Sequence, residues 1–116
     1  MNITRVYADE QGESHFAEDV IALHDAGAIG RLSEPMAATA VIFRKNDPGY
    51  DYDWHTAPRR QLIVLLDGAI EIEVSDGSRR ILRGGDILLV EDVSGKGHRT
   101  RHIEPTERRS LFIALD

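Results

Sequence analysis

One alternating segment, residues 69–75, constrains this chain more than any other feature of its sequence. Ile70, Ile72 and Val74 alternate with Glu71 and Glu73, and an Asp-Gly pair suited to a tight turn follows at once. Successive side chains of a β-strand point to opposite faces, so the pattern predicts a strand with one buried and one wet face. The turn then predicts a hairpin.

The sequence keeps this character from residue 36 onward. Short apolar or alternating runs are separated by turns rich in glycine, aspartate and proline, and no helical period is sustained. Short strands without intervening helices indicate an all-β sandwich or barrel. The predicted strands cover residues 36–44, 61–66, 69–75, 78–82, 86–90, 96–103 and 109–115.

The first 35 residues allow two interpretations. Residues 14–23 fit a short helix ending at Gly27, or an extended arm, and we favour the arm. The predicted organisation is an arm over residues 1–35 and a barrel over residues 36–116. The run from Val20 to Leu23 is apolar within an acidic segment, so we expect the arm to cover a partner's sheet edge in a homodimer.

Composition narrows the functional classes. The chain has 116 residues and no cysteine, which excludes disulfides, thiolate nucleophiles and cysteine-ligated zinc. It shows no signal pattern and no apolar run long enough for a membrane span, so we expect a cytoplasmic protein without a membrane partner. The net charge is −6 and the basic pairs are offset by nearby acids, so nucleic acid is not an expected partner.

A spaced set of residues lies between positions 49 and 68. Gly49, His55, Gln61 and Gly68 follow the order glycine, five residues, histidine, five residues, Gln, six residues, glycine. This resembles the first motif of the cupins, in which a second histidine would stand at Ala57 and a glutamate at Gln61. The resemblance to small single-domain bacterial cupins covers residues 36–115 and implies a jelly-roll barrel, or double-stranded β-helix.

A second cupin-like motif follows with an insertion. Gly85 is followed after five residues by Glu91 in place of proline, and two extra residues precede Gly95-Lys96-Gly97-His98. His102 stands where the family has an asparagine. On an extended strand His98, Thr100 and His102 share a face, as His55 and Gln61 would if residues 55–65 ran extended. We therefore expect these side chains to converge inside one barrel.

Two interpretations of this cluster stay open. The resemblance implies a divalent metal (Fe, Zn, Mn or Ni) on His55, His98, Gln61 and His102. A carboxamide is a weaker ligand than the carboxylate it replaces, so the alternative is a metal-free polar pocket. On the first interpretation, replacing Gln61 by glutamate would strengthen metal binding.

Arg59 has the parity of the pocket residues and would hold a carboxylate there, with His55, Gln61, His98 and Thr100 as the other ligand-binding candidates. The alternative is that the turn at Pro58 breaks the alternation and points Arg59 to solvent.

Three functions remain. The first is a homodimeric cupin that binds a small polar or carboxylate-bearing metabolite. The second is a metal-dependent enzyme of the dioxygenase or isomerase class. The third is a non-catalytic structural or regulatory dimer. Fold resemblance does not choose among them, and whether the chain is catalytic stays open.

Overall fold

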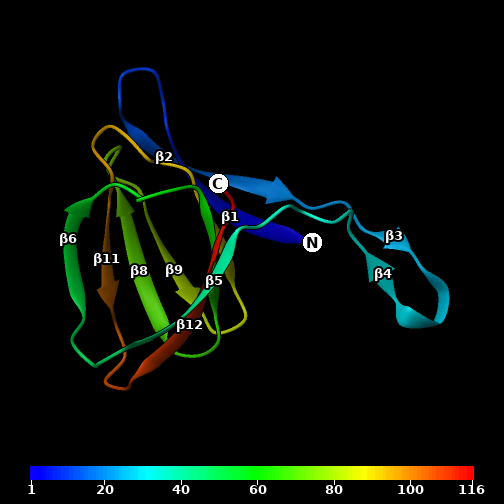
Figure 1. The fold of residues 1–116 in the computed structure, drawn as a ribbon. Coiled ribbons are helices and arrows are strands. Elements are labelled where there is room, and N and C mark those ends of the chain that lie inside the picture. Colours follow the sequence, from blue (N-terminus) through cyan, green and yellow to red (C-terminus); the bar gives the residue numbers. More distant parts are fainter.

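The computed structural model describes residues 1–116 as a β-structure with one short 3-10 helix (Figure 1). A six-stranded sheet has the order β2-β1-β10-β7-β12-β5, and a four-stranded sheet has the order β6-β11-β8-β9. No helix is long and apolar enough to cross a membrane. The elements are β1 (Asn2–Ala8), β2 (Ser14–Val20), β3 (His24–Asp25), η1 (Gly27–Ile29), β4 (Arg31–Leu32), β5 (Ala40–Asn46), β6 (Asp51–His55), β7 (Gln61–Leu65), β8 (Ala69–Val74), β9 (Arg79–Arg83), β10 (Ile87–Val90), β11 (His98–His102) and β12 (Arg108–Ala114).

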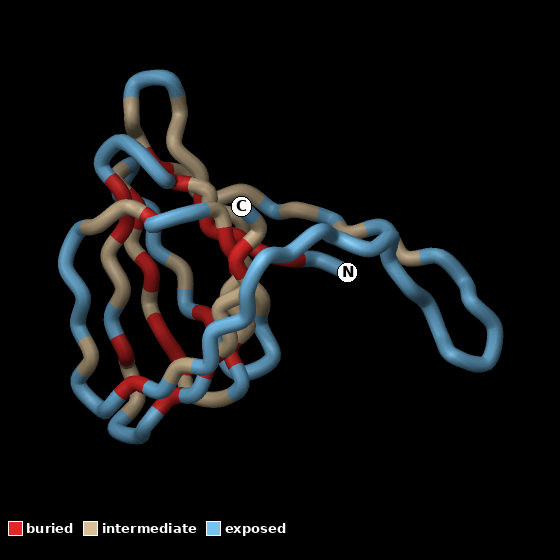
Figure 2. Tube along the Cα trace, viewed as in Figure 1, coloured by how far each residue is buried: buried red, intermediate tan, exposed pale blue.

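The two sheets face each other, and their inward side chains form the core (Figure 2). Strand β8 behaves as its alternation predicts, because Ile70, Ile72 and Val74 are buried while Glu71 and Glu73 stay partly exposed. Strands β7 and β10 contribute Leu65, Leu88 and Val90 to the same core from the other sheet. Burial of these apolar side chains is the main force that holds the sheets together.

The first twenty residues belong to the barrel rather than to an arm. Strand β1 pairs in parallel with β10 and antiparallel with β2, and it buries Ile3 and Val6. The physical reason is that β10 would otherwise be a sheet edge with apolar side chains on both faces. Residues 14–20 form an extended strand, which agrees with the preference for an extended conformation over a helix. Only residues 21–39 project from the barrel (Figure 1).

The chain turns between the two sheets at residues 56–60. The sequence expectation had residues 55–65 extended on one face, whereas β6 ends at His55 in one sheet and β7 begins at Gln61 in the other. Only Ala57 of the intervening segment is buried, and its N–H donates to the carbonyl of Asp92. The corner at residues 56–60 interrupts the strand and leaves Arg59 exposed, but the odd-numbered side chains point inward again in β7, where Gln61 and Leu65 are buried and Ile63 packs against the core.

Candidate functional site

His55 and His98 come together inside the barrel, where β6 ends and β11 begins. They are opposite each other in the pairing of β6 with β11, and their ring centroids lie 4.5 Å apart. Gly97 makes this approach possible, because its φ of +75° suits glycine and its Cα lies against the His55 carbonyl. The two histidines of the separate sequence motifs thus share one site.

One ring nitrogen of each histidine is already engaged. The Nδ1 of His98 lies 2.6 Å from a carboxylate oxygen of Asp92, which is fully buried. The Nδ1 of His55 lies 2.8 Å from the backbone carbonyl of Asp53 and donates to it. A carboxylate or carbonyl at Nδ1 fixes the ring and leaves Nε2 as the nitrogen available to another group.

Burial lowers the pKa of His55, and the neighbouring His98 acts in the same direction. The hydrogen bond to Asp53 opposes these effects without reversing them. His55 is therefore neutral near pH 7, and its Nε2 is a hydrogen-bond acceptor there.

Both histidines line a small cavity between the sheets, with a volume of about 50 Å³. This is space for a few water molecules or one compact polar group. Its polar wall comes from β5, β6, β11, β12 and the turn before β6, and apolar side chains complete it. The lining residues are Arg44, Tyr50, His55, Ala57, Ile63, Ile70, Ile72, Leu88, His98, Thr100, Arg108 and Phe112.

Two arginines dominate the electrostatics of this cavity. Arg108 is only 4% exposed, its Nη2 donates to Asn46 at 2.7 Å, and its buried Nε has no partner. Arg44 donates to the hydroxyl of Tyr50 at 3.2 Å, and its guanidinium lies 4.8 Å from the ring centroid of Phe112. Burial lowers the pKa of Arg108, and the like charge of Arg44 acts in the same direction.

These two side chains differ from the other arginines of the protein. Arg44 and Arg108 have no carboxylate partner, and of the remaining unpaired arginines Arg31 and Arg59 are both exposed to water. The eight arginines that form ion pairs with carboxylates are Arg5, Arg60, Arg79, Arg80, Arg83, Arg99, Arg101 and Arg109. Two of the four arginines without a carboxylate partner therefore line the cavity, and burial makes the unpaired charge of Arg108 costly.

The other residues expected at the site lie elsewhere, except Thr100, which lines the cavity. Arg59 is exposed in the corner after His55, as expected if the turn at Pro58 breaks the alternation and points this side chain to solvent. Gln61 is buried at the start of β7, on the same face of the strand as Ile63, but only Ile63 lines the cavity. His102 lies at the far end of β11, where its Nε2 bonds to the carbonyl of Thr106.

The residues present do not fit a resident metal ion. The cavity offers two imidazoles, and no group of three or more histidine, cysteine, aspartate or glutamate side chains is placed to hold a metal. Arg44 and Arg108 share the same small space, and their charge repels a cation. Of the expected ligand set only His55 and His98 line the cavity, whereas Gln61 lies outside its lining and His102 bonds to the carbonyl of Thr106 at the other end of β11.

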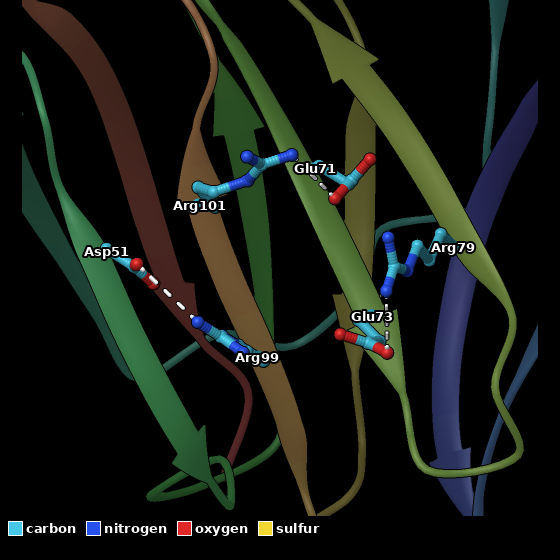
Figure 3. Close-up of a pocket in the computed structure, with 6 residues that line it drawn as sticks. All are labelled: Asp51, Glu71, Glu73, Arg79, Arg99 and Arg101. Carbon is cyan, nitrogen blue, oxygen red and sulfur yellow. Dashed lines mark hydrogen bonds and ion pairs between the residues drawn. The ribbon is translucent and has the colours of Figure 1, made fainter.

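A second concavity, on the outer face of the four-stranded sheet, is charged but already neutralised (Figure 3). Arg101 pairs with Glu71 at 3.0 Å, and Arg79 with Glu73 at 3.4 Å. Asp51 and Arg99 form a third pair on the same face. Exposed pairs of this kind contribute little energy and leave no free charge for a ligand, so this face is a solvated surface.

Sequence reasoning missed Arg44, Arg108 and Asp92. Arg108 lies on the same face of β12 as Phe112, and Arg44 lies on the same face of β5 as Asn46. Strand alternation could therefore have indicated that both arginines point inward. The pair at residues 108 and 109 was instead interpreted as a surface charge offset by neighbouring acids. Asp92 lies in the loop after β10, where no periodicity points inward.

Several solved structures share this fold. The cupin domain of Schizosaccharomyces pombe Cnp3 covers 100% of this chain and 83% of its own, with a TM-score of 0.55 and 15% identity. The match to Drosophila melanogaster CENP-C, in its structure bound to CAL1, covers 80% of this chain and 78% of that one, with a TM-score of 0.54 and 11% sequence identity. The match to a cupin domain from Bordetella pertussis Tohama I covers 66% of this chain and 79% of that one, with a TM-score of 0.51 and 20% sequence identity. The likeness confirms the predicted cupin jelly roll and bears on the fold alone.

The sequence of this chain is similar to that of one curated protein. The Oryzines biosynthesis cluster protein J of Aspergillus oryzae (strain ATCC 42149 / RIB 40) is 33% identical over 70 residues. This match covers 60% of the chain and 37% of that protein, so the chain spans little more than a third of its relative's length. No protein-family model matches the chain.

Proposed function

We propose that this chain, which has the fold of a cupin, binds a small carboxylate-bearing molecule inside its barrel. The observation that carries the proposal is the Arg108 guanidinium, which is 4% exposed and has no carboxylate partner. A buried charge without a counterion is strongly unfavourable, and an anionic ligand supplies the missing partner. Guanidinium groups also match carboxylates in shape and in hydrogen-bond geometry.

The neighbouring side chains support the same ligand class. Arg44 brings a second unpaired guanidinium, and Thr100 adds a hydroxyl to the lining. His55 and His98 leave their Nε2 atoms for a hydroxyl, a water molecule or a second oxygen of the ligand. Apolar walls such as Ile72 exclude water and strengthen these polar contacts. The volume of about 50 Å³ favours a compact anion.

Thermal unfolding with a panel of small acids tests this proposal. Acetate, pyruvate and succinate serve as probes, with acetamide and succinamide as uncharged controls at constant ionic strength. A ligand that binds the folded state raises its stability by about 2.7 kcal/mol at a concentration of 100 Kd. We expect at least one carboxylate to raise the Tm and the amides to have no effect.

Two variants locate the effect. Arg108→Gln removes the buried guanidinium and is expected to abolish the carboxylate-dependent rise in Tm. Arg59→Gln removes an exposed guanidinium outside the cavity and is expected to leave the rise unchanged. The proposal is wrong if no carboxylate stabilises the wild-type protein, or if Arg108→Gln responds as strongly as the wild type.

A further inference from the structure

The two sheets present opposite hydrogen-bonding characters to the cavity. Arg44 on β5 and Arg108 on β12 line it from the six-stranded sheet, and we call this side the arginine wall. His55 on β6 and His98 on β11 line it from the four-stranded sheet, and we call this side the histidine wall. A guanidinium has N–H donors and no acceptor, so the arginine wall donates. The character of the histidine wall depends on which ring nitrogens carry protons.

His55 contributes an acceptor to this wall. Its Nδ1 lies 2.8 Å from the backbone carbonyl of Asp53, which only accepts, so Nδ1 carries the proton. Burial lowers the pKa of His55, so a second proton on Nε2 is disfavoured near pH 7. The Nε2 of His55 therefore keeps a lone pair, and the hydrogen bond that this ring makes within the chain is made through Nδ1.

His98 has the same arrangement. Its Nδ1 donates to the buried carboxylate of Asp92 at 2.6 Å, so Nε2 is again the nitrogen left for another group. In the neutral ring this nitrogen is also an acceptor. The ring centroids of His55 and His98 lie 4.5 Å apart, so a single ligand group can reach both imidazoles. Thr100, two residues along β11, adds a hydroxyl that donates or accepts.

Donors accumulate on the arginine wall. Arg108 uses Nη2 for Asn46 and leaves its buried Nε without a partner. Arg44 donates to the hydroxyl of Tyr50 at 3.2 Å, so the Tyr50 O–H is a further donor. A carboxylate satisfies such a wall, because it accepts several hydrogen bonds and neutralises a charge. An ionised carboxylate has no donor, however, and leaves the acceptor of the histidine wall unpaired.

We propose that the ligand is a small 2-hydroxy acid, with its carboxylate on the arginine wall and its hydroxyl donating to the Nε2 of His55. The carboxylate is the one that the proposed function requires, so the assignment of the hydroxyl rests on that function. A hydroxyl suits the histidine wall because it donates a hydrogen bond and carries no charge. An ammonium group also donates, but the positive charges of Arg44 and Arg108 in the same small space repel it. A 2-oxo group has no donor.

Isothermal titration calorimetry with matched acids tests this assignment on the wild-type chain. Glycolate, acetate and glycine share one acid skeleton and differ in the group on the second carbon. We expect glycolate to bind about tenfold or more tightly than acetate, because acetate leaves the acceptor of His55 unpaired. Glycine should bind more weakly than glycolate, since its ammonium group is repelled. Lactate and pyruvate compare a hydroxyl with an oxo group, and lactate should bind more tightly.

Two variants locate the preference. His55→Phe retains a planar ring without the acceptor, and we expect it to bind glycolate and acetate with affinities within about threefold of each other. His24→Phe is the matched control, because His24 is exposed on β3 outside the cavity and its loss should leave the wild-type preference intact. Circular dichroism and urea unfolding check that both variants fold. The comparison of acids on the wild type decides the matter even where His55→Phe does not fold.

The outcomes distinguish the hydroxyl from the carboxylate. If acetate binds and glycolate binds no more tightly, the hydroxyl assignment is wrong and carboxylate binding stands. A folded His55→Phe that keeps the wild-type preference for glycolate also contradicts the assignment, because the acceptor is then not His55. If none of these acids binds, the proposed function is wrong and the hydroxyl assignment is wrong with it.

Discussion

Gly97 lies directly against the backbone of His55: a Cβ added to Gly97 would stand 2.2 Å from the His55 carbonyl oxygen. Its φ is also +75°, in the left-handed region. Gly97→Ala therefore combines a backbone clash with conformational strain, and we expect it to lower the free energy of unfolding by about 3 kcal/mol or more. Urea unfolding measures this loss.

Gly77→Ala is the control for that substitution. Gly77 has a φ of +94°, but a Cβ there would meet nothing within 4 Å. The strain alone costs about 1–2 kcal/mol. Equal losses in the two variants would show that the contact between Gly97 and His55 contributes nothing.

Asp92 is expected to hold His98 in place. Its carboxylate is fully buried and accepts from the His98 Nδ1 at 2.6 Å. Asp92→Ala leaves that N–H without an acceptor, so the free energy of unfolding should fall by about 2–4 kcal/mol. Asp92→Asn retains an acceptor and should lose less. Asp47→Asn, at an exposed position, should change stability by less than about 0.5 kcal/mol.

Arg108 is expected to lower the free energy of unfolding of the ligand-free protein. Its guanidinium is buried beside Arg44 without a carboxylate, and burial lowers its pKa. Arg108→Gln removes this charge and retains an amide to bond with Asn46, so we expect the free energy of unfolding to rise by about 1 kcal/mol. A loss of stability in urea unfolding would show that the hydrogen bond to Asn46 outweighs the desolvation of the charge.

Metal binding is expected to be insensitive to Gln61. The cupin-like motif predicts a gain in affinity from Gln61→Glu, but Gln61 does not line the cavity that holds His55 and His98. A residue in a metal site typically changes affinity by about 10- to 100-fold. Calorimetric titration with Zn²⁺ and Ni²⁺ should show less than about a threefold difference between Gln61→Glu and wild type. A larger gain would place Gln61 beside the two histidines.

Alternation and turns predicted most strands from residue 36 onward, and the resemblance to the cupins predicted the jelly roll, whereas β1, β2 and β6 were not predicted as strands of the barrel. Ile70, Ile72 and Val74 on β8 are buried as the pattern required, and His55 and His98 meet because two motifs on adjacent strands bring them together. The burial on β8 depends on local periodicity, which is visible in a single sequence, whereas the meeting of His55 and His98 joins distant parts of the chain and was implied by the resemblance to the cupin motifs.

The rest of the site depends on where the chain changes sheet. Arg59 lies in the corner after His55 and is exposed there, because the chain has left the strand, whereas the inward alternation resumes at Gln61 on β7. Arg108 belongs to a basic pair that nearby acids offset in the sequence, so its burial was not predicted. Burial of an unpaired guanidinium contradicts local preference, and positions of that kind are where functional sites are expected to lie.

His15 bridges two aspartates from different hairpins. Its Nε2 lies 2.7 Å from Asp9 and its Nδ1 lies 2.8 Å from Asp76. The hydrogen bond to Asp9, followed by that to Asp76, raises the pKa of His15. A raised pKa in the folded state means that His15 stabilises the protein fully below its unfolded pKa of about 6.5, and that this contribution is lost as the pH rises through the higher folded value.

His15→Gln should therefore lose stability in a pH-dependent way. The hydrogen bond to His15 lowers the pKa of Asp9, and hydrogen bonds from Ser78, with a further one from His15, lower the pKa of Asp76. The two carboxylates are therefore ionised from about pH 4 upward, and the bridge is intact between about pH 4 and 6.5. We expect urea unfolding to show the largest difference between wild type and His15→Gln at about pH 5.5 and a smaller one at pH 8.5. Comparing the two proteins at each pH cancels the titration of distant groups such as His55. A difference that stays constant between these pH values, or widens on the alkaline side, would show that His15 contributes as a neutral hydrogen-bonding group rather than as a cation held by Asp9 and Asp76.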